Sequence, residues 1–368
     1  MKTMECLAHG RDNNFNLLRA LAAGAVIVSH SWPASLGPGG TEPLVTSLHF
    51  SLGTAAVMVF FAVSGFLIAK SFDRRSSVAD FAAARVARLF PALAVVSLVT
   101  VLVIGPIFTR EPLPLYFSDR ETIEYTPRTL SLILRRNLLP GLFEDTPYPG
   151  VNGSLWTLYY EACCYLGLTA AGLLGFLHSR RYPILLFAYA VVYVAARSGL
   201  IPDATTYADL SLPFIAGMTA YIWRREIPLN LGLLLILAAA AALLQSFDSA
   251  RQEGWALAFS YGGLWFGGLE LKALRAYNRV GDFSYGLYIY GWPVQQMLAS
   301  ALPGISPFGM AAMALPCALV PAAASWFLVE RPALARRHFL AGVLGKQRLR
   351  QDPCAAPPVT TADHSALD

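Results

Sequence analysis

Two ionisable side chains, Arg19 and His30, lie within an apolar run of the sequence, NFNLLRALAAGAVIVSHSWP at residues 14–33. They are eleven positions apart, which at 100° per residue is about 20° from whole helical turns. On a helix both would point from one face, about 16 Å apart along the axis. Ionisable residues inside a membrane must be paired or hydrated, so we expect both to line one polar cavity. An unperturbed imidazole titrates near neutrality, so His30 suits a general base.

Each of these residues also has a simpler interpretation. Arg19 alone could extend to lipid phosphate at the membrane interface. His30 is followed by Ser31, Trp32 and Pro33, so it could be a polar residue at the outer interface beside an aromatic belt.

A carboxylate, Glu161, lies eight positions after Gly153 in another apolar segment, 153–176. If this helix enters from the outer side, Glu161 is about 12 Å below the surface, within reach of His30. It could fix the imidazole tautomer and stabilise the imidazolium. It could equally pair with Arg19 and hold the bundle together, and the sequence leaves both interpretations open.

Two arginines, Arg85 and Arg88, are three positions apart and so share a helix face. They suit phosphate recognition, and anionic lipid headgroups are the simplest phosphate source. Ser64 stands beside Gly65, a small pair that permits close helix packing. Tyr285 and Tyr288, also three apart, could line a cavity or pack in the core.

These residues belong to a chain of 368 residues that is 55% hydrophobic and 14% charged, against roughly 25% charged residues in soluble domains. Apolar blocks recur from residue 15 to residue 329, which predicts one membrane domain over 1–340. The tail 341–368 is predicted to be disordered. The five cysteines show no disulfide or zinc spacing, so we expect no metal site. The net charge of +5 lies in short clusters between apolar blocks, so we expect no nucleic-acid partner.

The blocks predict an all-α, polytopic integral membrane bundle of about ten transmembrane helices, at roughly 20 residues per crossing. The predicted helices are 14–33, 47–70, 90–108, 153–176, 182–200, 206–223, 229–246, 254–270, 281–301 and 307–329. Most basic residues fall on the side of the N-terminus, which predicts that both termini are cytoplasmic. Residues 71–89 form a basic amphipathic stretch on that side, and 109–152 form the longest outer loop. No internal repeat is evident, which weakens an inverted-repeat transporter interpretation.

Six fragments in this order resemble motifs of the membrane-bound acyltransferase family 3. They are NFNLLR with the following His30, FFAVSGFLIAKSF at 60–72, FAAARVARLFP at 81–91, GSLWTLYYEACCYL at 153–166, GDFSYGLYIYGWPVQQM at 281–297 and FLVERPA at 327–333. One position departs from the pattern. Many relatives carry a second His in the penultimate helix, where this chain has Gly291, so any role of that His is absent or supplied by another residue.

The resemblance implies an integral membrane O-acyltransferase of the bacterial cytoplasmic (inner) membrane, acting on exopolysaccharide, lipopolysaccharide or lipo-oligosaccharide. Acetyl-CoA or another acyl-CoA is the implied donor, bound through Arg85 and Arg88 with Ser64, Tyr285 and Tyr288 nearby. Catalysis is expected from His30, Glu161 and Arg19. The implied partners are the acyl-CoA, a glycan or glycolipid acceptor and membrane lipids, with no permanently bound cofactor.

Three alternatives remain on the sequence alone. The chain could be a transporter or channel in which Arg19, His30 and Glu161 form an ion pathway. It could be a non-enzymatic partner of glycan-synthesis machinery, or an acyltransferase that acts on a cytoplasmic small molecule. The acyl group, the acceptor hydroxyl and the oligomeric state are not specified by the sequence.

Overall fold

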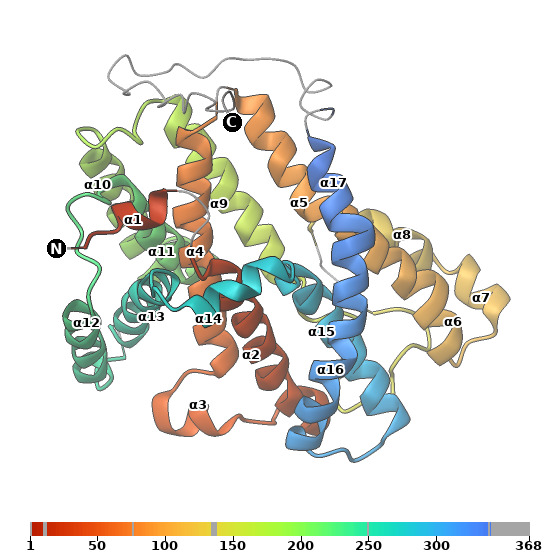
Figure 1. Ribbon diagram of the computed structural model, residues 1–368. Helices are drawn as coiled ribbons and strands as arrows, with labels where there is room; N and C mark the ends of the chain where they lie inside the picture. Colours follow the sequence, from red (N-terminus) through yellow and green to blue (C-terminus); the bar gives the residue numbers. More distant parts are fainter. Residues whose placement is uncertain are drawn as a thin grey trace, which may run out of the picture.

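The computed structural model describes residues 2–9, 13–75, 77–133, 138–248, 250–337 and 339. All regular elements in these ranges are helices (Figure 1), so the predicted all-α class is confirmed there. The predicted tail at 341–368 lies outside the described residues.

Each of the ten predicted segments coincides with helical structure. The corresponding helices are α2 (Phe15–Leu36), α4 (Leu52–Asp73), α5 (Val78–Val99), α9 (Trp156–Leu173), α10 (Tyr182–Arg197), α11 (Thr205–Ile222), α12 (Leu231–Leu244), α13 (Arg251–Gly267), α15 (Ser284–Ala301) and α16 (Pro307–Ser325). Three helical runs in the described part of the chain are long and apolar enough to cross a membrane, namely Leu52–Asp73, Val78–Phe108 and Pro307–Ala335. A membrane helical protein fits these runs, and ten crossings stay a prediction.

Shorter elements connect these helices. They are α1 (Glu5–Ala8), α3 (Pro43–Leu48), the π-helix η1 (Thr100–Ile104), α6 (Gly105–Phe108), α7 (Leu113–Ser118), α8 (Arg120–Leu130), α14 (Lys272–Arg275), the 3₁₀-helix η2 (Ala276–Arg279), the π-helix η3 (Trp326–Glu330) and α17 (Arg331–Ala335). The outer loop predicted at 109–152 therefore contains two helices, α7 and α8.

The predicted boundary between a short stretch at 71–89 and a helix at 90–108 was wrong. The hydroxyl of Ser77 caps α5 by accepting from the Asp80 amide, and the helix then runs through Pro91 to Val99. A proline inside a membrane helix is tolerated because neighbouring groups satisfy the freed carbonyl. Consequently Arg85 and Arg88 sit within a long helix of the bundle.

The centre of the bundle is built around α2 and α4. Helix α2 packs against α4, α15 and α16, and α4 packs in addition against α11 and α13. Two glycines allow the closest of these approaches, because a Cβ on Gly65 would collide with the Phe214 carbonyl and one on Gly217 with the Ala62 carbonyl. Small residues at such positions let membrane helices pack backbone to backbone.

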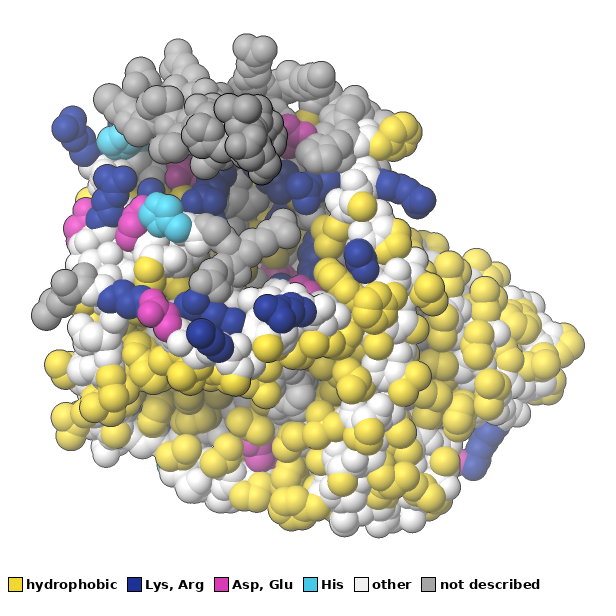
Figure 2. Space-filling view, viewed as in Figure 1, with side chains coloured by type: hydrophobic (Ala, Val, Ile, Leu, Met, Phe, Trp, Pro, Cys, Tyr) yellow, Lys and Arg dark blue, Asp and Glu magenta, His cyan; other side chains and the backbone are white. Residues whose placement is uncertain are grey.

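Charge is unevenly distributed over the surface. On the face shown in Figure 2, most of the visible Lys and Arg side chains gather over the upper half, and hydrophobic side chains cover most of the lower half. Figure 1 shows that the upper half includes the beginning of α5, and that α2 runs down into the lower half.

Candidate functional site

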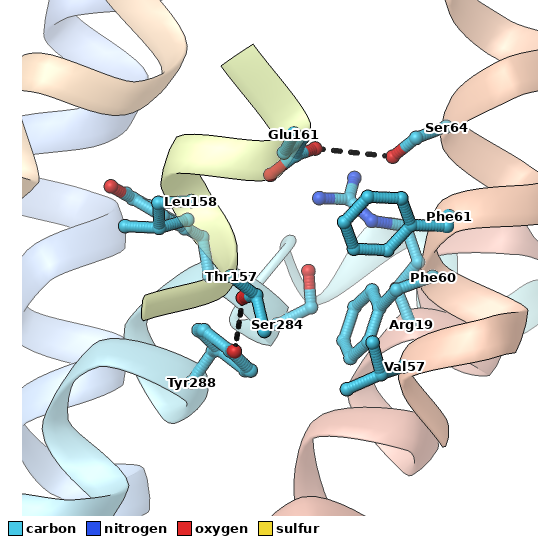
Figure 3. Close-up of a pocket in the computed structure, with 11 residues that line it drawn as sticks. Arg19, Val57, Phe60, Phe61, Ser64, Thr157, Leu158, Glu161, Ser284 and Tyr288 are labelled. Atoms are coloured by element: carbon cyan, nitrogen blue, oxygen red, sulfur yellow. Dashed lines mark hydrogen bonds between the residues drawn. The ribbon is translucent and has the colours of Figure 1, made fainter. Parts of the chain in front are cut away.

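A cavity of about 50 Å³, room for a few water molecules, opens between α2, α4, α9 and α15. Figure 3 shows the side chains that line it. They are Arg19 from α2, Val57, Phe60, Phe61 and Ser64 from α4, Thr157, Leu158 and Glu161 from α9, and Ser284, Tyr285 and Tyr288 from α15. Five of the eight predicted site residues, Arg19, Ser64, Glu161, Tyr285 and Tyr288, thus line one cavity.

Glu161 forms the acidic wall of this cavity. Its carboxylate accepts a hydrogen bond from the Ser64 hydroxyl at 3.2 Å and another from the Tyr165 hydroxyl. These bonds are to hydroxyl groups rather than to His30 or Arg19, the two partners considered from the sequence. The Arg19 side chain nevertheless extends from α2 towards Glu161 (Figure 3). A carboxylate and a guanidinium therefore face the same small volume.

The arginine–carboxylate network, defined as Arg19, Arg88, Asp282 and Glu330, includes one residue of the cavity lining, Arg19. Asp282 Oδ2 lies 3.2 Å from Arg19 Nη1 and 2.8 Å from Arg88 Nη2, and Arg88 Nη1 lies 3.0 Å from Glu330 Oε2. Ser284 donates its hydroxyl to Asp282 at 2.5 Å. The network joins α2, α5, η3 and the residues just before α15.

The carboxyl group of Asp282 remains ionised in this network. Its side chain is 12% exposed. Burial raises its pKa, but the charges of Arg88 and Arg19 outweigh burial and lower the pKa from 3.8 to about 2. One carboxylate thereby holds two guanidinium groups.

The two arginines of the FAAARVARLFP segment have different surroundings. Arg88 is engaged by Asp282 and Glu330. Arg85 makes no ion pair or hydrogen bond to another described residue, and its Nε is buried without a partner; its guanidinium lies 5.9 Å from the Phe81 ring. The charge of Arg85 is close enough to interact with Glu161 and Tyr165. Arg85 is therefore the arginine of this pair whose donors remain available for an anion.

His30 lies beyond the cavity rather than in its lining. Its Nδ1 is 3.5 Å from the Ser154 hydroxyl, and its ring meets Trp292 edge-on at 5.0 Å. Arg19 and His30 both face α9 and α15, as their spacing predicted. The prediction that they line one cavity was wrong, because side chains from α4, α9 and α15 fill the space between them.

The segment before α9 is fixed to α15 next to His30. The Trp292 indole donates to the Gly150 carbonyl at 2.8 Å, and the Asn152 amide donates to the Ile289 carbonyl at 2.8 Å. These bonds hold Ser154 and Trp292 in place on two sides of the imidazole. The sequence fragments contained both residues but gave no sign that they meet His30.

Gly291 lies close against Ile27 of α2, so a larger residue there would require the Ile27 side chain to shift. A Cβ at Gly291 would lie 2.7 Å from Ile27 Cγ1. Four residues later, Gln295 donates its amide to the Ile27 carbonyl at 2.7 Å and to the Ser31 hydroxyl at 3.0 Å. Close packing of α15 on α2, with Gln295 as a polar anchor, takes the place of the second histidine expected there.

Sequence reasoning missed Asp282 and Glu330 as members of the site. Both stand in fragments that were recognised, GDFSYGLY and FLVERPA. A usable signal was present, since arginines in apolar segments need carboxylate partners. Acidic residues in or beside apolar segments are the candidates under this rule, and Glu161, Asp282 and Glu330 are among them.

Comparisons with known proteins identify relatives of this chain along most of its length. The model of a family described as an acyltransferase domain matches residues 12–331. The chain is 28% identical over 352 residues to an O-acetyl transferase of Shigella phage Sf6, covering 89% of this chain and 97% of that protein. It is 29% identical over 377 residues to Nodulation protein 10 of Rhizobium leguminosarum bv. viciae, covering 89% and 95%.

A third relative is the exopolysaccharide production protein ExoZ of Rhizobium meliloti (strain 1021). It is 29% identical over 324 residues, which cover 82% of this chain and 96% of the relative. No solved structure matches the chain.

Proposed function

Since the chain belongs to this acyltransferase family and is an acyltransferase, we propose that it is an integral membrane O-acyltransferase of the bacterial cytoplasmic membrane. It moves a short acyl group, acetyl, from acyl-CoA to a hydroxyl of an extracytoplasmic glycan. The observation that carries the proposal is a small cavity inside the bundle whose lining brings together Arg19, Ser64 and Glu161, with His30 one layer further along the same helices. The names of two relatives, an O-acetyl transferase and an exopolysaccharide production protein, support the acyl group and the acceptor class.

The proposed topology has ten crossings with both termini in the cytoplasm. The gathering of Lys and Arg over the half of the visible face that includes the start of α5 (Figure 2) supports a cytoplasmic position for that half, because basic residues are enriched on the cytoplasmic side of membrane proteins. On this orientation Arg19 and Arg85 lie towards the cytoplasm and His30 towards the outer surface. The donor then enters from the cytoplasm and the acceptor approaches from outside.

The donor phosphates bind Arg85 in this proposal. Its guanidinium has unused donors, and planar guanidinium groups match phosphate geometry. Arg88 contributes positive potential but keeps its carboxylate partners. The flexible thioester arm extends from Arg85 past Arg19 and brings the acyl group into the cavity.

His30 is the proposed general base. Its Nε2 makes no hydrogen bond to any described residue, which leaves that atom free to accept the proton of an acceptor hydroxyl. The hydroxyl oxygen attacks the thioester carbonyl carbon, the new C–O bond forms, and the C–S bond breaks. The proton taken by His30 passes to the leaving CoA thiolate, so the imidazole is neutral again.

The test uses the purified full chain with acetyl-CoA and surface glycan from a strain lacking the gene. His30→Gln should lower acyl transfer by about 10²-fold to 10⁴-fold, the usual contribution of a general base. Thermal stabilisation by acetyl-CoA should persist, because His30 lies away from Arg85. His9→Gln is the matched control, since the His9 side chain is 70% exposed and should leave the rate unchanged.

Two results would contradict the proposal. Full transfer by the His30 variant would remove His30 from the mechanism. A wild-type protein that is not stabilised by acetyl-CoA, and whose loss leaves glycan O-acylation intact by mass spectrometry, would instead fit an ion pathway or a non-enzymatic partner.

A further inference from the structure

Three side chains close the cavity on the side that faces His30. They are Phe60 from α4, Thr157 from α9 and Tyr288 from α15, and we call them the barrier residues. Thr157 Oγ1 and Tyr288 Oη are hydrogen-bonded at 2.5 Å. The Phe60 and Tyr288 rings meet edge to face at 5.9 Å. Thr157 and Tyr288 are 5% and 8% exposed, so both are buried, and Phe60 is partly buried beside them.

The barrier stands one helical turn away from His30. Ser154, which contacts His30, precedes Thr157 by three positions, and Trp292, which also contacts His30, follows Tyr288 by four. One turn corresponds to about 5 Å. Figure 3 shows Glu161 and the end of the Arg19 side chain on one side of the Thr157–Tyr288 pair, and Glu161 follows Thr157 by four positions in α9, away from Ser154. The barrier residues therefore separate the cavity from the imidazole.

We propose that the barrier residues, with Tyr288 as the principal one, set the length of the acyl group that this protein transfers. The inference rests on the proposed function, because it takes the cavity as the place that receives the acyl group. The cavity of about 50 Å³ has room for a few water-sized groups. An acetyl group adds one methyl beyond its carbonyl carbon, whereas each further methylene needs space that the barrier side chains already fill.

Transfer to a hydroxyl held at His30 requires the Thr157–Tyr288 hydrogen bond to open, so that the thioester carbonyl and the imidazole share one space. The Tyr288 ring must then turn into volume next to the acyl group. A short acyl chain leaves that volume free, and a long chain occupies it. Selection therefore arises from the packing of apolar groups, in which a single additional methylene is discriminated about 10-fold to 200-fold.

The experiment compares acetyl-CoA and hexanoyl-CoA in one reaction with purified full-length protein and acceptor glycan. Tyr288→Ala removes the ring and should raise the hexanoyl-to-acetyl ratio of kcat/KM by about tenfold or more. Phe60→Leu enlarges the same end of the cavity and should shift the ratio in the same direction. Tyr290→Ala is the matched control, because Tyr290 is a 7% exposed tyrosine of α15 outside the cavity lining.

Thermal unfolding of each variant shows whether it is folded. The hexanoyl-to-acetyl ratio of kcat/KM is measured with both donors on the same protein preparation. A general loss of stability lowers both rates and leaves the ratio unchanged. Folded Tyr288→Ala and Phe60→Leu variants that keep the wild-type ratio would overturn the inference while wild-type acetyl transfer still supports the proposed function. A wild-type protein that transfers no acyl group from acyl-CoA would overturn the proposed function and the inference with it.

Discussion

Replacing Asp282 by Asn tests the arginine–carboxylate network most directly. The change keeps the shape of the side chain but removes the negative charge shared by Arg19 and Arg88, at 3.2 and 2.8 Å. We expect a loss of stability, because two buried cations would then depend on Glu330 alone, and only Arg88 contacts it. Arg19 would lose its ion pair and be drawn towards Glu161 across the cavity.

The size of the effect follows from two independent estimates. Lowering the pKa of Asp282 from 3.8 to about 2 corresponds to about 2–3 kcal/mol of stability. Removing one partner of a buried ion pair generally costs about 3–5 kcal/mol, and the lower end applies because Arg88 retains Glu330. We therefore expect a loss of about 2–3 kcal/mol.

The pH dependence of this contribution has a definite sign. A carboxylate whose pKa is lowered in the folded state stabilises the protein fully above its unfolded pKa of about 3.9. The contribution is lost only as pH falls from there towards the folded value of about 2. The difference between wild type and Asp282→Asn should therefore be constant from about pH 5 to pH 8.

The assay is unfolding of the detergent-solubilised protein, followed by tryptophan fluorescence. Asp248→Asn is the control, since that carboxylate pairs with Arg251 at 2.5 Å but is 92% exposed, and exposed ion pairs contribute little. A double-mutant cycle with Arg19→Met should give a coupling of about 0.5–3 kcal/mol. If Asp282→Asn destabilises no more than Asp248→Asn, or if the coupling is absent, the reasoning about the network is refuted.

Two further predictions concern Arg85, the proposed binding residue for the acyl donor, and the packing of α11 on α4. Arg85→Ala should raise the KM for acetyl-CoA at least about tenfold with little change in Tm, because a charged hydrogen bond contributes about 1.5–3 kcal/mol. The control is Lys272→Ala, which removes a basic side chain of α14. An equal KM in the two variants would contradict the assignment of Arg85. Gly217→Val should prevent α11 from packing on α4, because a Cβ there meets the Ala62 carbonyl. Its Tm and folded yield should fall sharply, whereas Gly167→Val, at an exposed position of α9 where nothing lies within 4 Å of an added Cβ, should cost far less.

The helices could be predicted well from the sequence, and the reasons are physical. Long apolar blocks separated by charged or Pro-rich segments indicate membrane helices, and every predicted block is helical. The predicted helix boundary just before Pro91 was wrong, because α5 continues through this proline. A local pattern cannot reveal that continuation, since it depends on neighbouring helices that satisfy the freed carbonyl.

The candidate site was predicted in part. The spacing of Arg19 and His30 correctly indicated one helix face, because helical geometry is local. The barrier between them could not be predicted, since it requires Phe60, Thr157 and Tyr288 from three different helices to meet. The partners of Arg19 and Arg88 depend in the same way on contacts across more than 190 sequence positions.

The charges around the cavity suggest why the two arginines of α5 have different roles. Three guanidinium groups, Arg19, Arg85 and Arg88, are matched by three carboxylic groups, Glu161, Asp282 and Glu330. Arg88 and Arg19 are held by Asp282 and Glu330 through direct ion pairs, whereas Arg85 and Glu161 interact only through space. An incoming phosphate can therefore take Arg85 without breaking an existing ion pair, and doing so leaves Glu161 freer to interact with Arg19. On the proposed function, donor binding at Arg85 would thus change the electrostatic balance of the cavity before the acyl group enters it.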